Sequence, residues 1–63
     1  MLDIMIEQWN NLDGTTDYLW SVWRDGRRVH MGGTHASADA AETEARAYCR
    51  GQLGAEPDGV TRL

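Results

Sequence analysis

Apolar and polar side chains alternate with a period of two at the start of the chain. Leu2, Ile4 and Ile6 share one side, and the alternate side chains from Asp3 to Trp9 share the other. This is the period of a β-strand, whose successive side chains point to opposite faces. The pattern predicts a strand over residues 2–9. Residues 10–17 are rich in Asn, Asp, Gly and Thr, which is typical of a loop.

Two further strands are predicted on either side of Asp25-Gly26. Residues 18–24 are dense in aromatic and β-branched side chains, residues 27–31 form the returning run, and Gly32-Gly33 is expected to end it. Asp-Gly between two such runs is typical of a two-residue hairpin turn, which sets the register of the strands. That register pairs Arg24 with Arg27, Trp23 with Arg28, Val22 with Val29, Ser21 with His30 and Trp20 with Met31.

Helix-forming residues dominate the stretch from 38 to 53. Ser37 is the expected N-cap, although Asp39 to Glu42 offers a rival capping box two residues later. Gly54 and Pro57 are expected to end the helix. The tail over 55–63 is either a frayed end or a short fourth strand at the sheet edge. One helical stripe holds the small or neutral side chains of Ala38, Ala41, Ala45, Cys49 and Gln52.

These elements predict a single α+β domain over residues 1–63. It is a three-stranded antiparallel meander (β-β-β-α) with one helix packed on one face of the sheet. A chain of 63 residues buries only a small core, so its stability is expected to be marginal. The face toward the helix is expected to hold Leu2, Ile4, Ile6, Tyr18, Trp20, Val22, Val29 and Met31.

The other face of the sheet is the predicted interaction surface, because one helix covers only one face. Trp, Met and Arg are enriched at protein interfaces, and exposed apolar patches often mark contact surfaces. We therefore expect a non-catalytic interaction module that forms a homodimer or binds another protein. In the purely structural alternative, Trp23 only packs on Arg28 across the strands. The candidate residues are Met5, Trp9, Leu19, Trp23, Arg28 and His30.

Single-stranded nucleic acid is the alternative partner. Trp23, Arg28 and His30 on the open sheet face, with the basic patch of Arg24 and Arg27 at the hairpin tip, would together stack bases and hold phosphates. The net charge of −4, with ten acidic residues against six arginines, argues against a dedicated duplex-DNA binder.

Other kinds of site find little support in the sequence. His30, His35 and Cys49 match no zinc-ligand spacing, and Cys49 lies on the apolar helical stripe, where it would be inert. We expect no enzyme activity, no metal and no cofactor. No segment is apolar enough to span a membrane, the start of the chain lacks the basic region of a signal peptide, and a single cysteine suits the cytoplasm.

The segment from Asp25-Gly26 through Val29 and His35 to Ser37–Glu42 resembles the hairpin and helix of small bacterial βββα domains, notably the YegP-like family. Trp23 stands where that family has a small residue, and His35 where it often has tyrosine. The same outline is similar to HicB-like antitoxin domains and to the DNA-binding modules of integrases. The resemblance covers about a third of the chain and implies the fold only.

Overall fold

A computed structural model describes all 63 residues of the chain. Three long strands are followed by a helix, whose last turn is a wider π-helical turn, and by a short strand. The elements are β1 (Leu2–Asn10), β2 (Thr16–Arg24), β3 (Arg27–His35), α1 (Ala38–Tyr48), the π-helical turn (Cys49–Leu53) and β4 (Gly59–Arg62). The predicted α+β fold, a meander followed by a helix, is confirmed.

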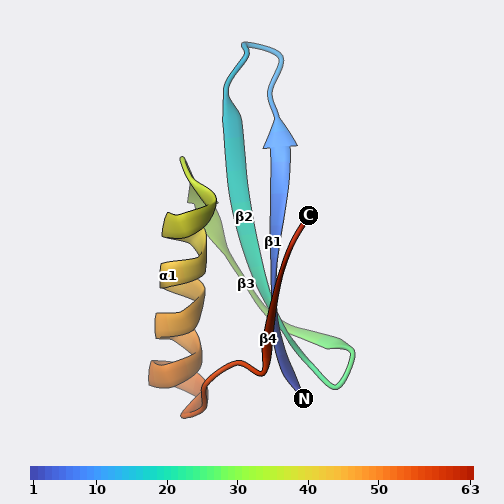
Figure 1. Cartoon of the computed structure of the whole chain (residues 1–63), viewed down its shortest axis with the longest axis vertical. Helices are drawn as coiled ribbons and strands as arrows, with labels where there is room; N and C mark the ends of the chain where they lie inside the picture. Colours follow the sequence, from blue (N-terminus) through green and yellow to red (C-terminus); the bar gives the residue numbers. More distant parts are fainter.

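The sheet has four strands in the order β3-β2-β1-β4. The chain returns from the helix to place β4 beside β1 and parallel to it, as Figure 1 shows. Backbone hydrogen bonds from Asp58 to Leu2 (2.6 Å) and from Leu63 to Ile6 (2.9 Å) extend this pairing at both ends. Of the two alternatives for the tail, the structure therefore shows the edge strand.

The core lies between α1 and one face of the sheet. Trp20, predicted on the face toward the helix, is only 3% exposed and packs with the small side chains of Ala41 and Ala45 and with Tyr48. Alanine at these positions lets the helix lie close to the sheet, because no bulky side chain separates them. The buried apolar residues are Leu2, Ile4, Ile6, Trp20, Val22, Ala41, Ala45 and Cys49.

Strand β3 contains two register shifts, and these make part of the predicted pairing wrong. Next to the turn, Trp23 pairs with Arg28 as expected, but beyond it Val22 pairs with His30 and Ser21 with Met31. Val29 is the extra residue of a β-bulge, and this inserted residue moves the following side chains to the opposite face until the second shift, between Met31 and Thr34, restores the alternation. His30 therefore faces the helix, whereas Met31 faces away from it.

Two further expectations about β3 are wrong. Val29 and Met31 are 45% and 47% exposed, so neither belongs to the core. Gly32-Gly33 does not end the strand, which continues to His35. A Cβ atom at Gly32 would lie 1.9 Å from Trp20 Cε2. The indole of Trp20 thus occupies the space that a side chain on β3 would need, and glycine is the residue that leaves it free.

Ser37 is the N-cap of the helix, as predicted, and its Oγ accepts a hydrogen bond from the amide of Ala40 (3.1 Å). The helical conformation extends to Leu53 through the π-helical turn, and Gly54 closes it in the left-handed conformation (φ 66°). Gln52, expected on the buried stripe, is exposed. A π-helical turn holds more residues than an α-helical turn, so it rotates Gln52 out of the stripe.

Arg62 ties β4 to the helix. Its guanidinium donates hydrogen bonds to Asp39 (2.7 Å) and to Glu42 (3.0 Å), and Glu42 also accepts one from Arg46 (2.9 Å). The hydrogen bonds from Arg46 and Arg62 hold the pKa of the Glu42 carboxyl below its usual 4.5. This carboxylate therefore stabilises the fold at neutral pH.

We expect this contribution to disappear in acid. A carboxyl whose pKa is lower in the folded state stabilises the protein above the unfolded-state pKa, here 4.5, and stops doing so as the pH falls through the folded-state value. In urea unfolding at several pH values, the free energy of unfolding of the wild type should fall by about 0.5 kcal/mol on acidification, a value typical of a surface ion pair. The Glu42→Gln variant should not show this decrease. Equal pH dependence in both proteins would contradict this role.

Candidate functional site

The face of the sheet that points away from α1 (the open face) has an apolar centre. The cross-strand pairs Asp3–Trp23, Met5–Ser21 and Glu7–Leu19 place alternate residues of β1 and β2 on this face. Beyond them, Arg28 lies opposite Trp23 on β3, and Met31 lies opposite Ser21. No helix covers this side of the sheet (Figure 1). The apolar residues of this face are thus Met5, Leu19, Trp23 and Met31, of which Met31 is 47% exposed and the other three are partly exposed.

Trp23 lies along the open face and does not project from it. Its indole N–H donates a hydrogen bond to Ser21 Oγ (2.8 Å), and Ser21 is only 5% exposed beneath it. The ring is thereby held in one orientation, while its outer surface stays partly accessible. A fixed aromatic ring costs little conformational entropy when a partner covers it.

The structure brings five of the six candidate residues onto the open face. Four of them, Met5, Leu19, Trp23 and Arg28, lie over the body of the sheet, and Trp9 lies further out, 57% exposed. The placement of His30 on this face is wrong, because the bulge at Val29 turns its ring toward the helix. Met31 takes its place on the open face. The second shift in β3 spans Gly32 and Gly33, and glycine in a strand is a signal of such an irregularity.

Charges on the open face separate toward its two ends. Arg28 lies at the end near the β2–β3 turn, together with the single carboxylate of Asp3. Glu7 and Asp17 lie at the opposite end. Trp9 donates its indole hydrogen to Glu7 (3.2 Å), which orients that carboxylate. One end of the face therefore carries the cation, and the other end carries only anions.

The predicted basic patch at the hairpin tip is divided between the two sides of the sheet. Arg24 and Arg27 pair with each other across the turn, and Arg24 also pairs with Leu2, so it points to the helix side. Only Arg28 points to the open face. The three arginines thus do not form one cationic surface.

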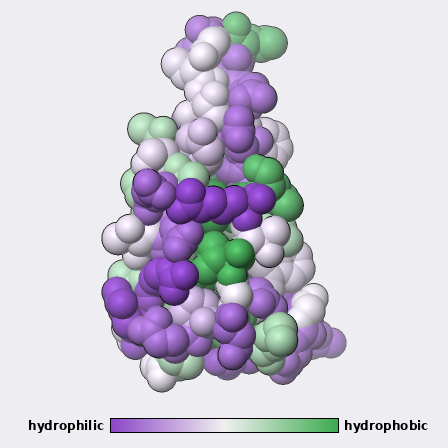
Figure 2. All heavy atoms as spheres, in the orientation of Figure 1, coloured by the Kyte–Doolittle hydropathy of each residue, from purple (hydrophilic) through white to green (hydrophobic).

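The hairpin of β1 and β2 extends beyond the helix as an arm (Figure 1). Its tip, residues 11–15, is held by hydrogen bonds from Asn11 to Asp17 (3.0 Å) and from Thr15 to Asp13 (2.9 Å). Leu12 is fully exposed there. Figure 2 shows that hydrophobic side chains reach the surface both at this tip and in the body, with more polar side chains between them.

The potential metal ligands of the chain are dispersed, and its single cysteine is buried. No group of three or more His, Cys, Asp or Glu side chains is placed to hold a metal ion. Burial raises the pKa of the Cys49 thiol, which disfavours the reactive thiolate. None of the helices is long and apolar enough to cross a membrane.

Comparisons with known proteins give no family for this chain. No protein-family model matches it, and no curated protein or solved structure is significantly similar to it. The resemblance to small bacterial βββα domains stays a prediction, and the function has to be argued from the geometry.

Proposed function

We propose that this chain is a non-catalytic interaction module of the cytoplasm that binds a second copy of itself through the open face. The observation that carries the proposal is the composition of this face: it carries Met5, Leu19, Trp23 and Met31, with Arg28 and Asp3 flanking Trp23 at one end and Glu7 flanking Leu19 toward the other. Only 9 of the 63 residues are buried, so covering this face would add substantially to a small core.

The charges favour a second copy as the partner. In a symmetric dimer the same surface serves both subunits, so the surface must complement itself. A two-fold axis between the sheets and oblique to the strands places Arg28 of one copy near Glu7 of the other, because the two residues lie diagonally across the open face. It also stacks the two apolar centres, in the manner of packed sheets. The open face fits this arrangement because its charges are separated along the strands.

Nucleic acid fits the open face less well. His30 points to the other side of the sheet, and Trp23 is hydrogen-bonded along the surface. Arg28 is accompanied on the face by Asp3, Glu7 and Asp17, whose carboxylates repel phosphates. In the proposed dimer, by contrast, Glu7 is a contact for Arg28 of the other copy.

Sedimentation equilibrium at high micromolar concentration tests the proposal. We expect a dimer for the wild type and a monomer for Met31→Glu, because this change places an unpaired charge in the apolar centre and should weaken association at least about ten-fold. Thr43→Glu is the matched control: it adds the same charge on the exposed surface of the helix, and it should leave the dimer intact.

Two results would contradict the dimer. One is a wild-type monomer at these concentrations. The other is a dimer that Met31→Glu leaves unchanged, which would place the contact elsewhere. A monomer whose tryptophan fluorescence is quenched by single-stranded oligonucleotides, less so with added salt, would favour nucleic acid instead.

A further inference from the structure

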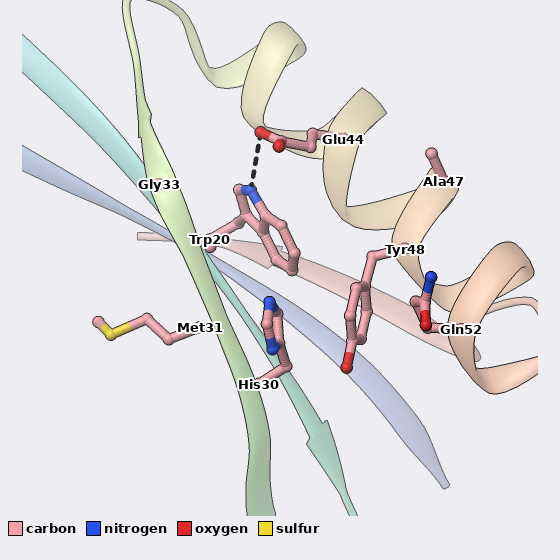
Figure 3. Close-up of a pocket in the computed structure, with 9 residues that line it drawn as sticks. Trp20, His30, Met31, Gly33, Glu44, Ala47, Tyr48 and Gln52 are labelled. Carbon is pink, nitrogen blue, oxygen red and sulfur yellow. Dashed lines mark hydrogen bonds between the residues drawn. The ribbon is translucent and has the colours of Figure 1, made fainter.

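A groove opens between strand β3 and the helix, on the opposite side of the sheet from the open face. Its volume is about 460 Å³, in the lower part of the range for small-ligand pockets, roughly 300–1,000 Å³. Figure 3 shows the rings of Trp20, His30 and Tyr48 lying between β3 and α1, whereas Met31 points away. Glu44 and Gln52 complete the helix side of the groove.

Three aromatic rings form the wall of this groove. His30 stacks on Tyr48 with ring centroids 4.1 Å apart and planes 11° from parallel. The ring of Trp20 is 5.4 Å from that of His30 and 5.6 Å from that of Tyr48. Trp20 is buried, but His30 is exposed and Tyr48 partly so. The groove therefore presents aromatic surface to a ligand, and aromatic faces attract cations.

Glu44 is the only carboxylate that lines the groove, and no arginine lines it. The indole N–H of Trp20 donates to Glu44 Oε2 (3.3 Å), and His35 is hydrogen-bonded to the same oxygen. Oε1 accepts no hydrogen bond from the protein, and the side chain is half exposed. The carboxylate is thus positioned by Trp20 while one of its oxygens remains free for a ligand.

The groove borders an unpaired strand edge. β3 is the outermost strand on its side of the sheet. A strand edge can pair with an extended peptide, whose alternate side chains then point to one face of the enlarged sheet. Gly32 and Gly33 lie at this edge beside the groove, so backbone can approach without a large side chain in between.

We propose that this groove binds an arginine side chain of an extended partner segment that adds to the edge of β3. The guanidinium would donate to Glu44 Oε1 and lie against the rings of His30 and Tyr48. Arginine suits this environment better than lysine, because its planar group stacks on aromatic rings and matches a carboxylate. The site does not depend on association through the open face, since the two lie on opposite sides of the sheet.

A peptide titration followed by NMR tests this site. The probe is a seven-residue peptide of alternating valine and threonine with one central arginine, blocked at both ends. The control peptide has citrulline in place of the central arginine, which keeps the shape of the side chain and removes its charge. We expect the indole N–H resonance of Trp20 to shift with the arginine peptide, and citrulline to weaken binding about ten-fold or more, as for loss of a charged hydrogen bond.

Variants of the protein separate the site from general electrostatics. Glu44→Gln should weaken arginine-peptide binding about ten-fold or more, because it removes the charge but keeps an oxygen for Trp20. Glu56→Gln removes the same charge at an exposed position outside the groove, and should bind like the wild type. Equal binding of the two peptides, full binding by Glu44→Gln, or no shift at roughly millimolar peptide would each overturn the proposal.

Discussion

Trp20→Ala is expected to unfold the protein or nearly so. The side chain is 3% exposed and belongs to the single core cluster between α1 and the sheet. Replacing a buried tryptophan by alanine costs about 3–5 kcal/mol. This cost is comparable to the whole free energy of unfolding that a core of this size provides, roughly 3–5 kcal/mol. Urea unfolding followed by circular dichroism should show no folded baseline, or a midpoint close to zero denaturant.

Trp23→Ala is the matched control, on the same strand but on the opposite face. It loses a cross-strand neighbour and the hydrogen bond to Ser21 (2.8 Å), together worth about 1 kcal/mol. At concentrations where the protein is monomeric, this variant should stay folded. If Trp23→Ala were the more destructive of the two changes, the assignment of the two faces would be wrong.

Gly32→Ala is expected to cause the second largest loss of stability. The added Cβ would lie 1.9 Å from Cε2 of Trp20 and 2.2 Å from its Cζ2 and Nε1 atoms. The indole cannot simply move aside, because it is enclosed by the core and hydrogen-bonded to Glu44 (3.3 Å). Overpacking of this kind costs about 1–3 kcal/mol and sometimes more.

The adjacent glycine provides the control for this prediction. A Cβ at Gly33 meets no atom within 4 Å. Gly33→Ala should therefore leave the free energy of unfolding within about 0.5 kcal/mol of the wild type. Equal losses for both variants would mean that glycine is needed along this part of β3 for backbone flexibility, and that the close approach of Trp20 is not the reason.

The architecture could be predicted from the sequence because local signals agreed with one another. Alternation in β1, the Asp25-Gly26 turn, and the cap at Ser37 each specified one element, and together they indicated which face of β1 and β2 meets the helix. The position of β4 was left open, since four residues carry too little pattern to separate a strand from a frayed end.

The faces of β3 could not be predicted by alternation alone. Side chains in the run from Arg27 to Met31 alternate in a way that predicts Val29 and Met31 in the core. The bulge at Val29 shifts the pairing register by one residue, so both side chains lie outside the core. The second shift lies opposite Trp20, whose ring fills the space over Gly32. The groove formed by His30, Tyr48 and Glu44 follows from the bulge at Val29, so sequence reasoning missed it.

A charge-exchange experiment tests the proposed self-association most directly. Arg28→Glu and Glu7→Arg each place like charges at both ends of the symmetric contact, so each variant alone should sediment as a monomer under conditions where the wild type dimerises. An equimolar mixture restores both oppositely charged contacts between unlike copies, and we expect it to sediment as a heterodimer. A mixture that stays monomeric, or single variants that dimerise like the wild type, would contradict the proposed dimer.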